Sequence, residues 1–205
     1  MSVPAATVPR GVVPVLQRPE GVEPLPLVIV TPGRNLVRQG EATRGLWRID
    51  SGVLRAEALA PDGRELVVDL LGPGDLVGVP GSEPSPVTVR AVRPARLQPV
   101  APTAAGPLLA RRAHRAVGLA CDLAWRDVPT RVEHRLVDLA ARFGRPVDGG
   151  TLIPLTLTQE EIAGLAGTSR ESANRALHVL LASGRIGRRR RGRYVVGARL
   201  RGVRA

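Results

Sequence analysis

The stretch Thr158-Gln-Glu-Glu-Ile-Ala-Gly-Leu-Ala-Gly-Thr-Ser-Arg-Glu-Ser-Ala-Asn-Arg-Ala-Leu-His-Val-Leu-Leu-Ala-Ser183 decides the fold of the C-terminal half. Thr158 followed three residues later by Glu161 forms a capping box, which predicts that a helix begins there. Gly167 supplies a turn, because glycine adopts positive φ without strain. Ser169 is placed to cap a second helix. Two capped helices joined by a glycine turn indicate a helix–turn–helix.

The second of these helices has two different faces at about 100° per residue. One face is apolar: Ala173, Ala176, Leu177 and Leu180. The other is polar: Arg170, Glu171, Asn174, Arg175 and His178. Arginine pairs with guanine in a major groove, glutamate accepts from cytosine, and asparagine pairs with adenine. A surface helix with a merely solvated polar face is the alternative, but the spacing of cap, turn and second cap favours DNA binding. The base-reading set is therefore expected to be Arg170, Glu171, Asn174 and Arg175.

Charge is unevenly distributed along the chain, whose formal net charge is +12. Residues 1–103 hold 11 Arg against 10 Asp and Glu, whereas residues 104–205 hold 19 Arg against 8 Asp and Glu. A basic half joined to a nearly neutral half suggests a nucleic-acid module tethered to another domain. The chain has no Lys, so the abundance of Arg also reflects coding bias, and not every Arg is expected to be functional.

Composition excludes several other classes of protein. Cys121 is the only cysteine, which rules out an intrachain disulfide and a cysteine-ligated iron–sulfur or zinc site. No apolar run reaches the ~20 residues of a membrane span, and the N-terminus lacks the plan of a signal peptide. We expect a cytoplasmic protein with no membrane contact, no metal and no cofactor. Cys121 is interpreted as a small buried hydrophobe, with a redox reporter as the alternative.

The N-terminal half has the sequence pattern of a β domain. Residues 1–32 are rich in Pro, Val and Gly and are expected to be extended or irregular. Short alternating segments then predict strands over 35–38, 46–49, 53–59, 65–71, 76–79 and 87–92. Pro61-Asp62-Gly63 and Gly72-Pro73-Gly74-Asp75 predict tight turns. Closely spaced strands without helices indicate a barrel or roll.

Helical periodicity begins near Pro107. A small-residue apolar stripe indicates a helix that pairs with its own copy; its members are Leu109, Ala113, Ala116, Val117, Ala120, Leu123 and Ala124. Packing of this helix on the β domain alone is the alternative. A second helix is predicted over Val128–Phe143, ending at Gly144. Gly149-Gly150 is expected to open a loop, and a strand is predicted over Leu152–Leu157.

A basic segment follows the helix–turn–helix. Arg185 to Val196 reads as a strand, a basic turn and a returning strand, which together predict a wing. Nine arginines and no acidic residue lie between Gly184 and Ala205. A disordered basic tail is the alternative, and it suits residues 199–205 better than the wing. Arginines at the tip would lie along a phosphate backbone and add affinity without sequence information; they are Arg188, Arg189, Arg190 and Arg191.

These features together resemble the Crp/Fnr family of bacterial transcription regulators, over roughly residues 35–196. Ser169-Arg170-Glu171-Ser-Ala-Asn-Arg175 matches the family's recognition-helix motif. The resemblance implies that Arg170, Glu171 and Arg175 read a palindromic half-site, and that Thr158 and Ser169 contact phosphate. Thr168, beside Ser169, is expected to contact phosphate as well. The N-terminal half is similar to the family's cyclic-nucleotide-binding β-roll through Gly52-Val-Leu-Arg, Pro61-Asp-Gly-Arg-Glu-Leu and Leu71-Gly-Pro-Gly-Asp-Leu-Val-Gly78.

The β-roll also departs from the family's pattern. Members that bind cyclic AMP hold the ribose and phosphate with Gly-Glu and with Arg-Ser/Thr-Ala. Here the corresponding positions read Gly78-Val79 and Ser85-Pro86-Val87. The carboxylate and the guanidinium that a buried nucleotide needs are missing, so cyclic-nucleotide binding is not expected. Haem sensing is unsupported, because the three histidines lie outside the roll.

The sequence thus predicts an α+β chain in three parts: a β-roll (1–103), a dimerisation helix (104–127) and a winged helix–turn–helix (128–205). The expected function is a homodimeric regulator that binds palindromic double-stranded DNA without cyclic AMP, with RNA polymerase as a further partner. An architectural protein that compacts DNA without reading sequence is the alternative. A nucleic-acid enzyme is disfavoured, since no carboxylate cluster, nucleophile set or phosphate-cradling loop is present.

Overall fold

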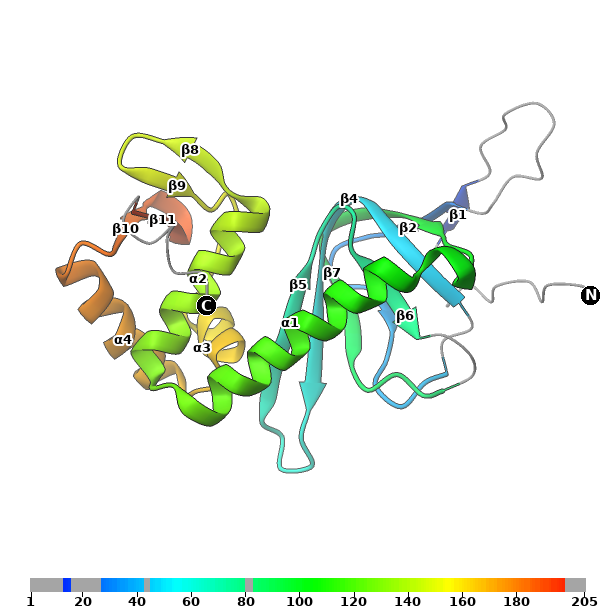
Figure 1. The fold of residues 1–205 in the computed structure, drawn as a ribbon, viewed down its shortest axis with the longest axis horizontal. Helices are drawn as coiled ribbons and strands as arrows, with labels where there is room; N and C mark the ends of the chain where they lie inside the picture. The colour runs from blue at the N-terminus through cyan, green and yellow to red at the C-terminus, as the bar shows by residue number, and fades with distance from the viewer. Residues whose placement is uncertain (1–12, 16–26, 43–44, 80–82, 198–205) are drawn as a thin grey trace, which may run out of the picture. The chain divides into compact units, whose positions relative to one another are not determined.

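The computed structural model describes residues 13–15, 27–42, 45–79 and 83–197 (Figure 1). The chain divides into two compact units, Met1–Arg64 with Val68–Val117, and Gly118–Ala205 with Glu65–Val67. Most of the N-terminal residues 1–32 and the tail 199–205 lie outside the described residues. Within the described ranges, no helix is both long and apolar enough to cross a membrane.

The first unit is built on a seven-stranded antiparallel β-roll. Its main path runs β1-β2-β7-β4-β5, with β3 paired to β7 and β6 paired to β4. The strands are β1 (Val13–Val15), β2 (Leu27–Val30), β3 (Asn35–Val37), β4 (Gly45–Leu59), β5 (Glu65–Leu71), β6 (Leu76–Val79) and β7 (Thr88–Pro99). The order places the two longest strands side by side, in a register that joins Trp47 to Pro99 and Glu57 to Thr88.

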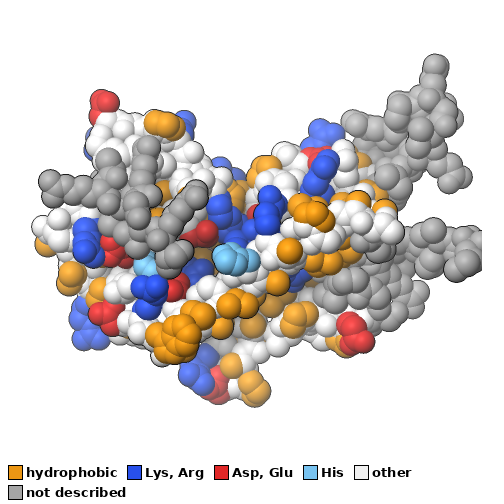
Figure 2. Space-filling view, in the orientation of Figure 1, with side chains coloured by type: hydrophobic (Ala, Val, Ile, Leu, Met, Phe, Trp, Pro, Cys, Tyr) orange, Lys and Arg blue, Asp and Glu red, His pale blue; other side chains and the backbone are white. Residues whose placement is uncertain are grey.

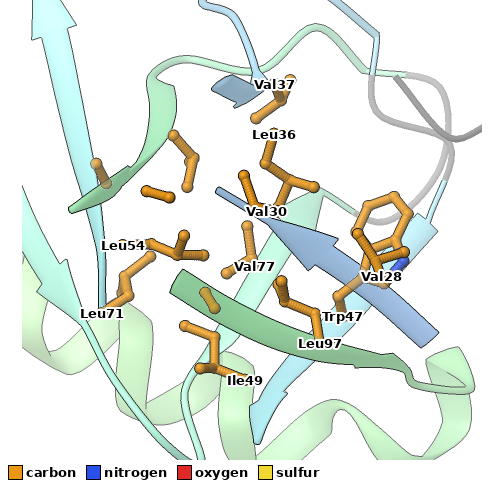
Figure 3. Packing of buried hydrophobic residues seen from close by; sticks show 14 of the residues in the cluster. Val28, Val30, Leu36, Val37, Trp47, Ile49, Leu54, Leu71, Val77 and Leu97 are labelled. Atoms are coloured by element: carbon orange, nitrogen blue, oxygen red, sulfur yellow. The ribbon is translucent and has the colours of Figure 1, made fainter. Parts of the chain in front are cut away.

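Buried apolar side chains from every long strand meet inside the roll (Figure 3). Trp47, Ile49 and Leu54 come from β4, Leu97 from β7, and Val28 and Val30 from β2; each is at most 3% exposed. Arg48, between two of these positions, is exposed. Such alternation buries one face of each strand, at about 1.5–3 kcal/mol per large side chain.

Gly52 is required where β4 is irregular. Its φ is +95°, and a Cβ there would overlap the Pro94 carbonyl oxygen and Ala95 of β7. The β4–β7 register shifts between Ile49 and Val53 at the same place. A glycine therefore lets the two backbones approach closely through the bulge.

The strand predictions were accurate for β5 and β6 and wrong for the two long central strands, β4 and β7, and for β2. β5 and β6 have the predicted bounds. The two strands predicted over 46–49 and 53–59 are one strand, because the bulge at Gly52 bends β4 without ending it. β7 continues to Pro99, well past the predicted end at residue 92. β2, within the Pro-rich start, was not predicted.

Helices α1 (Gly106–Trp125) and α2 (Val128–Phe143) follow a short 3₁₀ turn at Pro102–Ala104. Asp127 caps α2 by accepting a hydrogen bond from the Thr130 N–H at 3.0 Å. A hydrogen bond from the Thr130 hydroxyl and, second, this bond from the Thr130 N–H hold the pKa of Asp127 below its usual value. The bounds of α2 are those predicted.

The second unit packs α2, α3 (Gln159–Ala166) and α4 (Arg170–Ala182) with a four-stranded sheet of order β10-β11-β9-β8. The sheet contains β8 (Arg145–Val147), β9 (Gly150–Leu152), β10 (Ile186–Arg189) and β11 (Arg193–Val196). The strand predicted over 152–157 was wrong. β9 begins at Gly150 and ends at Leu152, and Pro154 just beyond lacks the N–H that a ladder needs.

Candidate nucleic-acid interface

The helix–turn–helix begins with the predicted capping box. The Thr158 N–H donates to Oε2 of Glu161 at 2.7 Å, and the Glu161 N–H donates to Oγ1 of Thr158 at 3.1 Å. Two backbone donors at the start of α3 are thereby satisfied. At its other end Gly167 adopts φ +58° and ψ +51°, the left-handed conformation that favours glycine.

Helix α4 is capped by Ser169, whose Oγ accepts from the Ser172 N–H at 3.2 Å. The four predicted apolar positions of α4 are all buried, at 3% exposure or less: Ala173, Ala176, Leu177 and Leu180. The pairing of α3 with α4 is therefore held by the face that the periodicity assigned to the core.

The opposite face of α4 is exposed over Arg170, Glu171, Arg175 and His178. Arg175 Nη2 donates to Oγ of Ser172 at 3.2 Å, which leaves other donors of its guanidinium available. The pKa of Glu171 is lowered, first by a hydrogen bond from its own backbone N–H and then by Ser169 and the two neighbouring arginines. Glu171 is thus an ionised hydrogen-bond acceptor at neutral pH.

Asn174 differs from the other predicted base-reading residues. It is only partly exposed, and its Oδ1 accepts a hydrogen bond from Nε2 of Gln159 at 2.6 Å. Gln159 is the first residue of α3, so this bond joins the two helices. Gln159 was not predicted from the sequence, since nothing in the spacing of residues shows which residue of α3 faces Asn174.

The wing forms as predicted. β10 and β11 pair from Ile186 with Val196 to Arg189 with Arg193. The tip is a tight turn in which Arg191 adopts φ 60° and Gly192 φ 64°. Arg188, Arg189, Arg190 and Arg191 are all exposed, and no salt bridge joins them to a carboxylate of residues 27–42, 45–79 or 83–197. Tyr194 is buried behind them, and burial raises its pKa.

Arg185, at the base of the wing, has a structural role. Its Nη1 donates to Oε2 of Glu133 at 2.6 Å, and the Glu133 side chain is only 9% exposed. Glu133 lies on α2, so this ion pair fastens the helix to the residue before β10. A carboxylate beside the buried Val132 was the available signal for such a pair.

Two family models match this chain, one in each half. Residues 27–101 match the family described as the cyclic nucleotide-binding domain, and residues 130–200 match the Crp-like helix-turn-helix domain. A CRP-like cAMP-activated global transcriptional regulator of Mycobacterium tuberculosis is 36% identical over 184 residues, which cover 77% of this chain and 82% of the relative. The chain belongs to the Crp/Fnr family.

Other regulators are similar to this chain in sequence or in fold. The regulatory protein CysR of Synechococcus elongatus is 30% identical, over 78% of this chain and 82% of its own. The c-di-GMP responsive global regulator CLP of Xanthomonas campestris has a TM-score of 0.70 at 25% identity, covering 84% of this chain and 93% of CLP. A CRP/FNR-family regulator from Thermus thermophilus has the same fold, with a TM-score of 0.71 at 21% identity, covering 83% and 92%.

As a Crp/Fnr-type transcriptional regulator, the protein carries a DNA-binding helix–turn–helix and is not an enzyme. The polar face of α4 and the wing belong to that DNA-binding domain.

Helix α1 carries hydrophobic side chains along its exposed side (Figure 2). Of the seven expected seam residues, five are exposed: Ala113, Ala116, Val117, Ala120 and Ala124. Val117 is 62% exposed and Trp125, at the end of the helix, 80%. The two leucines have contacts within their own chain. Leu109 packs against the cluster of Leu46, Leu76 and Ala105, and a Cβ on Gly167 would overlap Leu123.

The other side of α1 is held to the β-roll by arginines. Arg115 donates from Nε to Asp69 at 2.8 Å and from Nη2 to Asp75 at 3.1 Å. Arg112 Nη1 donates to the Gly78 carbonyl at 2.7 Å, and burial lowers the pKa of Arg112. Half-buried ion pairs, not apolar contacts alone, therefore fix the first three turns of α1.

Proposed function

We propose that the protein is a homodimer that reads a palindromic DNA site and needs no cyclic nucleotide to do so. The observation that carries the proposal is the division of α4. One face is buried in the unit, while the other exposes Arg170, Glu171 and Arg175 with hydrogen-bonding groups free for DNA. RNA polymerase is the protein partner that a transcription regulator of this kind implies.

In this proposal the base-reading side chains keep the roles that their chemistry suggests. Arg170 and Arg175 donate to guanine, and the ionised Glu171 accepts from cytosine. Glu171 lies between the two arginines, which also lower its pKa. An arginine beside a carboxylate at a base edge distinguishes G·C from A·T, because guanine offers two adjacent acceptors to the arginine and cytosine an amino group to the carboxylate, whereas adenine offers only one acceptor beside its own amino group.

The phosphate contacts come from the helix caps and the wing. The Thr158 oxygen accepts a backbone N–H within its own helix, so its hydroxyl proton remains to be donated to phosphate. The Ser169 hydroxyl donates to Oγ of Ser172 at 3.2 Å, so it would have to rotate away from Ser172 to donate to a phosphate. Thr168 lies beside Ser169 in the turn. The exposed wing arginines Arg188–Arg191 would add non-specific affinity.

The dimer would form through the exposed face of α1. Ala110, Ala113, Val117, Ala120 and Ala124 recur at alternating spacings of three and four residues, which is the heptad pattern of a two-helix seam. Small residues allow the two helices to approach closely. A symmetric dimer can set two α4 helices about 34 Å apart, the separation that successive major grooves require.

The β-roll lacks the polar groups for a cyclic nucleotide. Valine follows Gly78 where cyclic-AMP binders have glutamate, and Ser85 stands where they have arginine. Ser85 is buried, and its Oγ donates to the Val87 carbonyl at 2.6 Å. The Gly78 carbonyl already accepts from Arg112. The M. tuberculosis relative is named as cAMP-activated, but these substitutions argue against carrying that property over.

The exposed arginine tip of the wing favours a second candidate, an architectural protein that binds any DNA. The two candidates differ in their affinity ratio between specific and random DNA. A regulator gains about 4–10 kcal/mol on its own site, whereas an architectural protein gains almost nothing.

Selection from a random duplex pool, with no nucleotide added, tests the proposal. We expect an enriched inverted repeat and tight binding that needs both half-sites. A matched duplex with one half-site scrambled is the control. Enrichment of a single half-site, or no enrichment of any motif, would contradict the proposal.

A further inference from the structure

The bond between Gln159 and Asn174 is a polar contact between the two helices of the helix–turn–helix. Gln159 Nε2 lies 2.6 Å from Asn174 Oδ1, and both side chains are partly buried. Neither the family motif nor the helical periodicity assigns Gln159 a role. Its position is defined by the capping box, because Thr158 fixes where α3 begins.

We propose that Gln159 determines which bases Asn174 reads. This inference rests on the proposed base-reading role of α4. Asparagine selects adenine when its oxygen accepts from N6 and its nitrogen donates to N7. Here the oxygen is turned toward α3 and engaged by Gln159, so the nitrogen, on the other branch of the amide, is the group that a base meets.

An amide that offers only N–H groups has a different base preference. Guanine presents two acceptors in the major groove and thymine presents O4, whereas cytosine presents a donor and adenine a single acceptor, N7, beside an amino donor that opposes a second N–H group. Asn174 should therefore favour guanine or thymine at its base pair and lose the bidentate contact with adenine. This replaces the adenine assignment made from the sequence alone.

The neighbours of Asn174 support a role at the DNA surface. Arg170 lies one turn before it on α4 and Arg175 follows it directly, and both are exposed. Gln159 itself stands at the N-terminal end of α3, next to the hydroxyl of Thr158. The pair thus lies between the proposed base-reading residues and a proposed phosphate contact.

Gln159→Glu inverts the pair without removing it. A carboxylate only accepts, so Asn174 must turn its N–H groups toward α3 and its oxygen toward DNA. A negative charge in the first turn of a helix is favourable, so folding should persist. The added charge weakens binding to all sequences alike, and base preference is therefore scored as a ratio between duplexes.

The test measures relative affinity for duplexes that carry each of the four bases at every position of a half-site. In the unmodified protein one position should prefer guanine or thymine. Gln159→Glu should move that preference to adenine or cytosine by roughly tenfold, about the discrimination of one good base contact. Asn174→Ala should abolish it, and Gln159→Glu should then have no further effect on the ratio.

Arg175→Ala distinguishes a failure of the Gln159 inference from a failure of the proposal that α4 reads bases. If Arg175→Ala relaxes one base pair while the Gln159 and Asn174 variants change none, the Gln159 inference is wrong and the base-reading proposal stands. If Arg175→Ala also changes no base preference, the base-reading role of α4 itself fails. A preference that persists unchanged in Gln159→Glu overturns the inference in either case.

Discussion

Arg115 in the first unit and Arg189 in the second are the same kind of side chain in two different electrostatic settings. Arg115 is about 21% exposed and bridges Asp69 and Asp75, so its charge is satisfied within the chain. Arg189 is exposed at the wing, where the described part of the chain supplies no carboxylate to pair with it. The first arginine holds the fold together and the second is available to an external anion.

The difference follows from how acidic residues are distributed. Residues 1–103 have nearly one carboxylate for each arginine, whereas residues 104–205 have 19 arginines and 8 carboxylates. Several of those eight are already engaged, as Glu133 is by Arg185. The surplus arginines therefore lie on the surface that is proposed to bind DNA. The net charge of a segment indicates such a surface only after the arginines that pair with carboxylates of the same chain are subtracted.

The largest effect is expected at Val117, on the proposed seam. Val117→Arg would bury two like charges near the two-fold axis without partners, which should weaken binding to the palindromic site at least about 100-fold. Sedimentation equilibrium and DNA titration measure the two consequences. Leu59→Arg is the matched control, since Leu59 is 58% exposed in the β-roll. A Val117→Arg protein that remains a tight-binding dimer would exclude this seam.

Arg115→Ala tests how much an arginine that is paired within the chain contributes to stability. Removing the guanidinium leaves Asp69 and Asp75 without their shared cation in a half-buried site, which should cost about 2–3 kcal/mol of unfolding free energy. Urea unfolding measures it. Arg96→Ala, at an exposed position of β7, is the control and should stay within about 0.5 kcal/mol. Equal losses in the two variants would show that the pairing is unimportant.

Arg175→Ala tests whether an exposed arginine of α4 reads a base. It should cost about 1–3 kcal/mol on the selected site and relax selectivity at one base pair, because a bidentate guanine contact is lost. Binding to random DNA should change much less. An equal loss on random and selected duplexes would reassign Arg175 to the phosphate backbone.

The wing should have a weaker and less selective effect. Replacing Arg189 and Arg190 with Ala should weaken binding to every sequence and make the salt dependence shallower, by about 0.9 in log–log slope per lost phosphate contact. Titrations at several salt concentrations measure the slope. An unchanged slope would mean that the wing arginines are solvated and do not touch DNA.

Acidification should have the smallest effect. The pKa of Glu171 is held below its ordinary value by its own backbone N–H and by Ser169. Its carboxylate should therefore stay mostly ionised at about pH 4.3, where an ordinary glutamate is half protonated, and the preference for cytosine at its base pair should not change between neutral pH and that point. Competition between two duplexes across this range measures it. A preference that falls by half near pH 4.3 would show that the folded protein does not lower this pKa.

Local signals predicted the parts of the fold that depend on local chemistry. Capping residues and apolar spacing gave the bounds of α2, the capping box at Thr158 and the buried face of α4. The β5 and β6 strands were equally clear, because glycine turns flank them.

Features that depend on distant partners could not be predicted. The apolar run after Leu152 looks like a strand, yet Pro154 interrupts the ladder while the Ile153 and Leu157 N–H groups still donate to Tyr194 and Gly192. β2 lies in a Pro-rich segment and is stabilised by pairing with β7. The Gln159–Asn174 bond depends on how α3 crosses α4, which the spacing of residues does not give.

In the proposed function, a dimer of this protein binds its palindrome without a cyclic nucleotide. The most direct test is an anisotropy titration of a labelled palindromic duplex, with and without saturating cyclic AMP. We predict dissociation constants that agree within about twofold, since the β-roll lacks the glutamate and arginine that would hold the nucleotide. Tight binding that appears only when cyclic AMP is added would contradict the account.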